Sequence, residues 1–227
     1  MALPPSSALM RLSFFVALVL LLLPPGSATE TASKWEAQVA ALESSHHQVA
    51  PPKHAVLFIG SSSIRGWRDI AKDFPDLPVI NHGFGGSQIS DSIVYFERLV
   101  LPFKPRLVVF YAGTNDLAAG KSPETVAADF RAFCAKMHTS LPETKILFIG
   151  LVMAPARWEL REKMALTNTL IAAFCASDPR RALIDLNPHM MTPDGQARLD
   201  LYIGDRLHMN RRGYKIWQEA LNPLLVD

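Results

Sequence analysis

The polar residues that could carry chemistry in this 227-residue chain fall in a few short segments. Three serines, residues 61–63, follow an apolar run that ends at Gly60. A serine hydroxyl is a poor nucleophile until a base removes its proton, and histidine suits that task near neutral pH. Asp205 and His208 are close enough in sequence for one turn to bring carboxylate and imidazole together and fix the ring tautomer. These residue types point to nucleophilic acyl transfer.

Acyl transfer also needs hydrogen-bond donors for the negative oxygen that develops at the attacked carbonyl. The candidates are the N–H of the serine itself, the N–H groups of the glycine-rich turn 83–86, and the side chain of Asn115. Gly85 and Gly86 let the backbone approach a substrate without a Cβ in the way. The serine turn alone also fits phosphate binding at a helix N-terminus, but that use leaves the asparagine, aspartate and histidine without a role.

The apolar pattern predicts the elements that position these groups. Runs of strand length recur at 55–59, 78–81, 106–111, 145–151 and 182–186. Helix-forming segments lie between and after them, near 64–74, 87–100, 123–139, 158–176 and 210–222. Nearly continuous apolar strands separated by helices indicate a parallel sheet covered on both faces. We therefore predict a doubly wound, three-layer α/β/α fold of about five strands.

Ligands of such sheets bind at the carboxyl ends of the strands, and the polar segments lie there. The serines follow the first strand, the glycine-rich turn the second, residues 113–116 the third, and Arg157 and Trp158 the fourth. Asp205 and His208 come just before the last helix, which can return them to the same edge. We therefore expect these segments to meet in one crevice.

In this order the segments resemble the characteristic blocks of the SGNH (GDSL) hydrolases, a superfamily of esterases, lipases, thioesterases and carbohydrate deacetylases. The resemblance implies that Ser62 is the nucleophile, His208 the base and Asp205 its partner. It also implies an oxyanion hole made by the Ser62 and Gly86 amides and the Asn115 side chain. The sheet it implies is flavodoxin-like.

The resemblance spans residues 54–222 and departs from the family pattern in two places. Ser61 stands where the usual Gly-Asp-Ser has its aspartate, and Ser87 stands where an aspartate often follows the oxyanion glycine. Neither missing carboxylate is catalytic in the family. We expect their loss to affect loop anchoring and substrate choice, not the hydrolytic mechanism.

Other residues near these segments have structural interpretations. Ser63 is expected to cap the helix after the first strand, and Asp116 can cap a helix through an Asx turn. Trp67 fits packing under the first helix as well as a pocket wall, so Arg157 and Trp158 are the better substrate-pocket candidates. The histidines expected to lie outside the catalytic set are His54, His82 and His189.

Residues 1–28 fit a secretory signal segment. Arg11 is the only charge before Glu30, and residues 12–23 are almost wholly apolar. Small residues follow, up to Ala28, and the apolar run is short for a bilayer span. We expect cleavage after Ala28 and a secreted or periplasmic protein, with an uncleaved anchor as the alternative.

The expected mature chain has a polar extension at 29–53 and a hydrolase domain at 54–227. A short amphipathic helix is predicted at 35–45, with Trp35, Val39 and Leu42 at helical spacing on one face, packed on the outside of the domain. Loss of the signal lowers the formal charge from +2 to +1, so nucleic acid is not a favoured partner. Cys134 and Cys175 show no metal-site spacing and are compatible with one disulfide or with two buried thiols.

These patterns predict an exported esterase that works through an acyl-enzyme with no metal or organic cofactor. Its partner would be a small ester or an acylated carbohydrate or lipid. Short acyl groups, such as acetyl on a carbohydrate, are favoured because the short helices and compact loops leave no long hydrophobic lid. Lysophospholipase or thioesterase activity remains open, as does a non-catalytic domain that binds glycan or lipid. The sequence leaves the oligomeric state open.

Overall fold

The computed structural model describes Met1, residues 26–48 and residues 51–226. The predicted signal segment, residues 1–28, falls almost wholly outside the described residues, so its cleavage and the export of the chain stay predictions. Among the helices that are described, none combines the length and the apolar character needed to cross a bilayer.

A five-stranded parallel sheet forms the centre of the described chain, in the order β2-β1-β3-β4-β5. Its strands are β1 (Val56–Gly60), β2 (Val79–Gly83), β3 (Leu107–Tyr111), β4 (Lys145–Ile149) and β5 (Arg181–Ile184). β1 and β3 are buried throughout, as continuous apolar strands covered on both faces should be. The predicted α/β fold is confirmed. The strand order reverses between β1 and β3, which places the expected crevice at their carboxyl ends.

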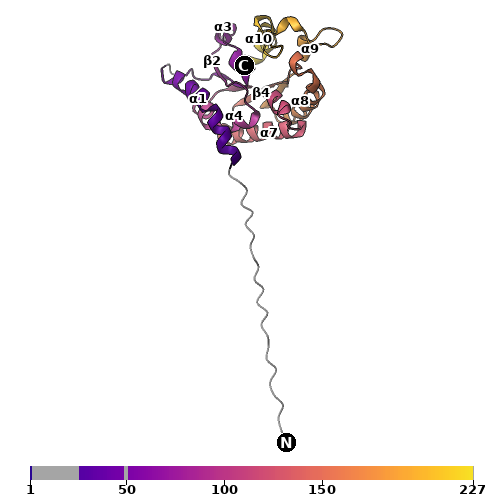
Figure 1. Ribbon diagram of the computed structural model, residues 1–227. Coiled ribbons are helices and arrows are strands. Elements are labelled where there is room, and N and C mark those ends of the chain that lie inside the picture. The colour runs from indigo at the N-terminus through magenta and orange to yellow at the C-terminus, as the bar shows by residue number, and fades with distance from the viewer. Residues whose placement is uncertain (2–25, 49–50, 227) are drawn as a thin grey trace.

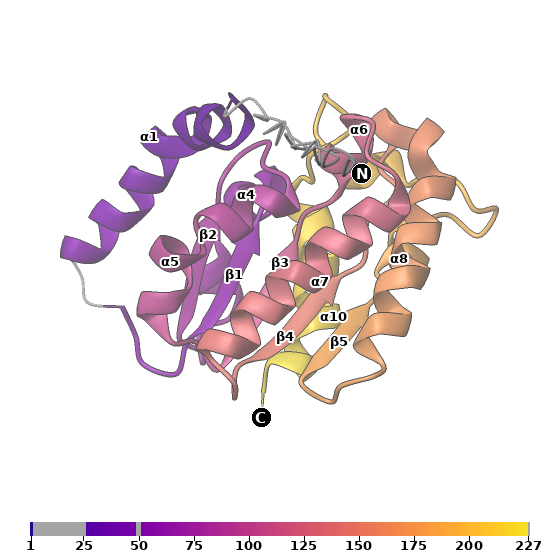
Figure 2. The same ribbon diagram turned by 90° about the horizontal axis from the view of Figure 1, so that it is seen from below.

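Helices cover both faces of the sheet (Figures 1 and 2). One face packs against α2 (Ser62–Gly66), α3 (Ile70–Asp73) and α10 (Arg211–Leu225). The other packs against α1 (Gly26–Gln48), α4 (Ile89–Val94), α5 (Phe96–Leu99), α7 (Pro123–Ser140) and α8 (Arg161–Cys175). Alternate strand residues supply the two cores, with Phe58 in the first and Leu57 and Ile59 in the second.

Short helical elements lie in the connections between the larger ones. They are η1 (Leu101–Phe103), α6 (Thr114–Ala118), η2 (Pro155–Leu160), α9 (Asn187–Met190) and η3 (Leu199–Leu201). The stretch 187–207, between β5 and the last helix, therefore contains two short helical turns. Ser122 accepts a hydrogen bond from the Thr125 N–H at the start of α7, which confirms the helix start predicted at 123.

Two of the predicted helices are each divided in two. The segment 64–74 forms α2 and α3, and the segment 87–100 forms α4 and α5. In the first case the Asn81 side chain of β2 donates to the carbonyl oxygens of Ile64 and Trp67, at 2.8 and 3.2 Å. A continuous helix would use those carbonyls for its own N–H groups, so this contact favours the break.

The N-terminal helix is longer than predicted, since α1 runs from Gly26 to Gln48 and not from 35 to 45. Trp35 and Val39, which were predicted to share one face, are 6% and 0% exposed and belong to the core of their side of the sheet. The helix lies at the periphery of the fold, as expected (Figure 2).

Both cysteines are buried free thiols. Burial raises the pKa of both, to about 11 for Cys175. A thiol that keeps its proton at neutral pH is a poor nucleophile, so these side chains serve as small packing residues of α7 and α8.

Candidate active site

A sharp turn at the end of β1 presents the serine predicted as the nucleophile. Gly60 pairs with Tyr111 of β3 and has a φ of 144°. A Cβ at this position would lie 2.0 Å from the Tyr111 carbonyl oxygen, so only glycine fits. The Ser61 N–H donates to the same oxygen at 3.0 Å, and Ser62 begins α2. Ser62 thus stands at the carboxyl edge of the sheet, where its N–H has no partner within its own helix.

α2 is held from α10 as well as from β2. The Tyr214 hydroxyl donates to the Ser63 carbonyl at 2.8 Å, and the Tyr214 ring stacks on Trp67 with centroids 5.2 Å apart. Trp67 is 1% exposed, so it is a packing residue and not a pocket wall. Ser63 lies inside α2, and Ser61 precedes it, so the prediction that Ser63 caps this helix is wrong.

Asp205 organises the loop that carries His208. One carboxylate oxygen accepts the N–H groups of Leu207 and His208, both at 2.9 Å, and the other lies 2.6 Å from His208 Nδ1. Partial burial alone would raise the pKa of Asp205. The hydrogen bonds from the His208 ring and from the two N–H groups outweigh this effect and lower the pKa to about 2. The carboxylate is therefore ionised near neutral pH and fixes both the turn and the imidazole ring.

His208 joins this loop to the serine turn. Its Nε2 lies 2.8 Å from Ser62 Oγ. When Nδ1–H donates to Asp205, Nε2 is the nitrogen left to accept a proton. The structure brings these three side chains into one hydrogen-bonded chain, which is the arrangement that activates a serine hydroxyl.

The predicted oxyanion donors lie at the ends of the neighbouring strands. Asn115, in α6, donates from Nδ2 to the Ser87 carbonyl at 2.9 Å, which ties α6 to the glycine-rich turn. Gly86 has a φ of 79°, and its N–H has no acceptor within the described residues. The Gly86 N–H and the second Nδ2 hydrogen of Asn115 can therefore serve a substrate oxygen.

The glycine-rich turn is anchored although Ser87 stands where the family often has an aspartate. Ser87 is buried and its hydroxyl donates to the Phe84 carbonyl at 2.9 Å. Both carboxylate oxygens of Asp116 lie 3.3 Å from the Ile89 N–H, and Lys121 Nζ lies 2.9 Å from one of them. Asp116 thus caps α4 and not its own helix, α6.

α1 contacts the glycine-rich turn, which no motif in the sequence indicated. Gln38 Oε1 accepts the Gly85 N–H at 2.8 Å. A Cβ at Gly86 would come within 3.1 Å of the Trp35 ring, so the indole covers that glycine. The helical spacing of Trp35 and Val39 signalled a buried face but gave no hint of what it would contact.

Salt bridges anchor α1 to the rest of this layer. Arg98 of α5 lies 2.7 Å from a Glu36 carboxylate oxygen and 2.5 Å from one of Glu43. Two carboxylates, seven residues apart on α1, thus pair with one guanidinium of α5. This double contact fixes the position of α1 along the layer. The support of the glycine-rich turn thus extends to residues well before the first strand.

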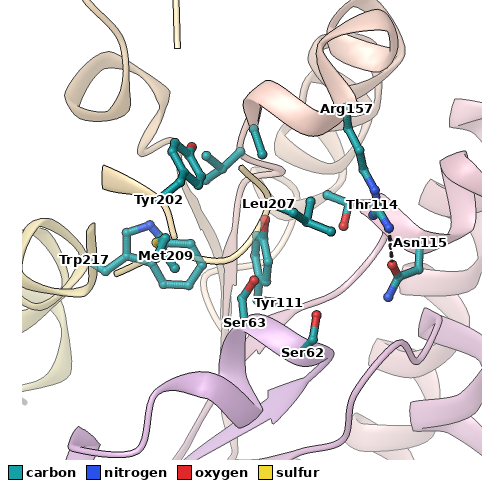
Figure 3. Close-up of a pocket in the computed structure, with 12 residues that line it drawn as sticks. Ser62, Ser63, Tyr111, Thr114, Asn115, Arg157, Tyr202, Leu207, Met209 and Trp217 are labelled. Atoms are coloured by element: carbon teal, nitrogen blue, oxygen red, sulfur yellow. Dashed lines mark hydrogen bonds between the residues drawn. The ribbon is translucent and has the colours of Figure 1, made fainter. Parts of the chain in front are cut away.

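Arg157 reaches the site from η2. Its Nη2 donates to Asn115 Oδ1 at 2.7 Å (Figure 3). The backbone leaves the helical path at Arg157, with φ −132° and ψ 28°. Trp158, the other predicted pocket residue, does not line the cavity at Ser62, and the Arg161 guanidinium lies over its ring, 5.5 Å from the centroid. Of the predicted pair, the structure brings only Arg157 to the site.

A cavity of about 20 Å³ lies at Ser62 (Figure 3). Asn115 and Arg157 form part of its polar wall, and Val152 and Leu207 form part of its apolar wall. A volume of this size accommodates about one water-sized group. The sequence did not point to the apolar wall, because its residues carry no catalytic signature.

The remaining histidines near the predicted segments lie away from this cavity. His82 is buried and its Nδ1 lies 2.6 Å from the Leu99 carbonyl oxygen. His54 precedes β1, at the opposite edge of the sheet, and His189 is exposed in α9. His208 is the histidine that contacts Ser62.

Known proteins share both the sequence pattern and the fold. The sequence model of the GDSL-like Lipase/Acylhydrolase family matches residues 59–216. Human platelet-activating factor acetylhydrolase IB subunit alpha1 is 31% identical over 180 residues, which cover 75% of each chain. The stretch matched by the family model holds Ser62, Asn115 and His208.

Two solved structures show the same architecture at lower identity. A GDSL-like lipase from Bacteroides thetaiotaomicron has a TM-score of 0.67 and 20% identity, with 85% of this chain and 95% of that one covered. A variant of an acetyl-xylooligosaccharide esterase from Geobacillus Stearmophilus has a TM-score of 0.61 and 17% identity, with 77% and 95% covered. At these identities the likeness concerns the fold alone. The family model and the 31% identical relative establish that the chain belongs to the GDSL-like lipase/acylhydrolase family and is a hydrolase of ester bonds.

Proposed function

We propose that the chain is an exported serine esterase that removes acetyl and other short acyl groups through an acyl-enzyme. The observation that carries the proposal is the chain of contacts from Asp205 to His208 to Ser62, at 2.6 and 2.8 Å. This chain ends at a cavity bordered by the oxyanion candidate Asn115.

In the first half of the proposed cycle, Ser62 Oγ attacks the ester carbonyl carbon while His208 Nε2 takes the hydroxyl proton. Asp205 stabilises the resulting imidazolium through Nδ1. The carbonyl oxygen becomes an oxyanion that accepts hydrogen bonds from the Ser62 and Gly86 N–H groups and from Asn115 Nδ2. Collapse of the tetrahedral intermediate breaks the bond to the alcohol oxygen, which leaves with the proton from His208.

In the second half, water attacks the acyl-enzyme. His208 Nε2 takes a proton from the water, and the same three donors hold the second oxyanion. Collapse breaks the bond to Ser62 Oγ, which recovers its proton from His208 as the carboxylic acid departs. Each proton has a carrier among these residues, so the proposed cycle calls for no metal or organic cofactor.

The size of the cavity supports a short acyl group. The cavity that Ser62 shares with Asn115, of about 20 Å³, suits an acetyl methyl, and a second cavity of about 420 Å³, bordered by Ser62 and His208, leaves room for the alcohol part of the ester. The names of two similar proteins, a platelet-activating factor acetylhydrolase and an acetyl-xylooligosaccharide esterase, also denote removal of acetyl groups. We therefore propose acetyl esters, including those of carbohydrates, as the substrates, with the signal segment 1–28 directing the chain out of the cytoplasm.

Hydrolysis of p-nitrophenyl acetate, butyrate and octanoate tests this proposal. Wild type should turn over the acetate with the highest kcat/KM, and Ser62→Ala should remove the activity. A preference for the octanoate would favour a lysophospholipase-like or long-chain thioesterase activity. Equal rates for wild type and Ser62→Ala would leave a non-catalytic domain that binds glycan or lipid.

A further inference from the structure

Ser62 borders two cavities, and Arg157 is the only charged side chain among the described residues that line the smaller one, beside Asn115. No ion pair joins it to a carboxylate in the described part of the chain. The charge of Glu159 acts on it, but that side chain is exposed and lies beyond ion-pair distance. Its one hydrogen bond to another side chain goes to the neutral Asn115. The active-site cavity thus holds a cation whose counter-charge does not come from the cavity wall.

A half-buried guanidinium without a counter-ion is costly. Burial lowers the pKa of Arg157, which reflects the loss of solvation of its charge. Buried charges in proteins are normally paired, because the field of the partner replaces that solvation. A guanidinium also presents five N–H donors in a planar fork that matches the oxygens of a carboxylate or a phosphate. Only the Nη2 contact is accounted for, so most of the fork is available to a ligand.

Two other polar groups in the wall of this cavity also lack a partner among the described residues. Tyr202 and Trp217 both line the cavity and are 7% and 0% exposed. The Tyr202 hydroxyl and the Trp217 Nε1 have no hydrogen-bond partner among the described residues. An indole N–H can only donate. The wall therefore combines one positive charge with donors that lack acceptors, and it carries no carboxylate.

We propose that Arg157 binds an anionic group of the substrate, a carboxylate or a phosphate, and so selects esters that carry a negative charge close to the scissile bond. The proposal rests on the proposed esterase function. Arg157 contacts the side chain that donates to the oxyanion, so its ligand lies only a few bonds from the reacting carbonyl. Arg157 is then a specificity-determining residue, distinct from the residues that break the bond.

Matched pairs of acetyl esters test the selectivity. One pair is 4-acetoxybenzoate and its neutral methyl ester, and 4-acetoxyphenyl phosphate replaces the carboxylate with a phosphate. A second pair, p-nitrophenyl hemisuccinate and p-nitrophenyl pentanoate, moves the charge to the acyl part. Because hydrogen bonds to charged groups are worth about 1.5–3 kcal/mol, wild type should prefer the anionic member of at least one comparison by about 10–100-fold in kcat/KM.

Substitution of the arginine should remove that preference. We expect Arg157→Gln to bring the anionic-to-neutral ratio close to one and Arg157→Lys to retain part of it. The matched control is Arg161→Gln, which removes the same charge from a partly exposed arginine that does not line the cavity and should leave the ratio unchanged. If Arg157→Gln lowered kcat/KM equally for both members of every pair, Arg157 would act only through Asn115. That result would overturn the proposal.

Binding without turnover separates this proposal from the esterase function. Calorimetry on Ser62→Ala should show 4-acetoxybenzoate bound more tightly than its methyl ester, and the added Arg157→Gln change should remove the difference. If wild type turns over neutral esters and Ser62→Ala binds both compounds equally, the esterase function stands and the role of Arg157 falls. If charge-selective binding occurs but no ester is cleaved, the role of Arg157 stands and the esterase function falls.

Discussion

The two sides of the site are held in different ways. Its nucleophile side consists of Ser62, Asp205 and His208, and its oxyanion side consists of Gly86, Asn115 and Arg157. On the nucleophile side each member bonds directly to the next, and the aspartate also bonds the backbone of its own loop. On the oxyanion side the members are held by α1, by the Ser87 carbonyl and by η2.

The nucleophile side is therefore held mainly by bonds among its own members, whereas the oxyanion side depends on contacts with other parts of the fold. Removing a member of the nucleophile side removes a step of the chemistry. Removing a support of the oxyanion side leaves the chemistry in place but displaces a donor, so its effects should be graded. Substitutions on the two sides test this contrast.

The largest effect is expected for His208→Ala. General acid–base catalysis contributes about 10²–10⁴-fold, so kcat for p-nitrophenyl acetate should fall by that factor. The side chain is 32% exposed, so its removal should leave the fold intact by circular dichroism. His189→Ala, at an exposed histidine away from the cavity, is the control and should keep wild-type kcat. An unchanged kcat in His208→Ala would contradict the assignment of the base.

Asn115→Ala should have the next largest effect. Loss of one oxyanion donor costs about 10²–10³-fold in kcat in other hydrolases, and Arg157 loses its partner at the same time. Ser62 and His208 are untouched, so Ser62 should still react with a fluorophosphonate. A rise in KM at constant kcat would show instead that Asn115 binds substrate and transition state equally.

Gln38→Ala tests the support of the oxyanion side from α1. The change removes the acceptor of the Gly85 N–H, and a typical net hydrogen bond of about 0.5–1.5 kcal/mol corresponds to about a 2–10-fold loss of kcat. Ser44→Ala is the control on the same helix, since its exposed hydroxyl bonds the Ala40 carbonyl of α1 and not the glycine-rich turn. Equal kcat values for the two variants would mean that α1 is not needed to position the turn.

The smallest expected effect is the contribution of Asp205 to stability at low pH. Its pKa of about 2 lies below the ordinary 3.8, so the contribution is complete above 3.8 and is lost as the pH falls through about 2. Solvent screens this side chain, which is 43% exposed, so the effect should be modest.

Denaturant unfolding of wild type and Asp205→Asn at a series of acid pH values measures this contribution. The difference in unfolding free energy should shrink as the pH falls from 3.8 towards about 2. A difference that stays constant over this interval would show that the carboxylate gains nothing from its charge in the folded state.

The nucleophile side could be predicted from the sequence because its geometry is local. Asp205 and His208 meet across one turn, and a strand that ends in Gly60 fixes where Ser62 points. The order of the blocks along the chain placed Asn115 after β3. Because the sheet is parallel, the carboxyl ends of β1 and β3 lie at the same edge, so Asn115 was expected near Ser62. The likeness to the SGNH family selected Ser62 among three adjacent serines.

The supports of the oxyanion side could not be predicted, because they depend on tertiary packing. The spacing of Trp35 and Val39 indicated a buried face but not that the indole would cover Gly86. The contact of Arg157 with Asn115 needs a break in η2 that no residue pattern marks. The division of the helix predicted at 64–74 also depends on tertiary packing, because it follows from the contact with the Asn81 side chain of β2.

Labelling with a fluorophosphonate, followed by peptide mapping, tests the central claim most directly. The label should appear on Ser62 alone, should be absent from Ser62→Ala, and should form much more slowly in His208→Ala, which lacks the base at 2.8 Å. A label on Ser61 or Ser63, or ester turnover that persists in Ser62→Ala, would contradict the assignment of Ser62 as the nucleophile.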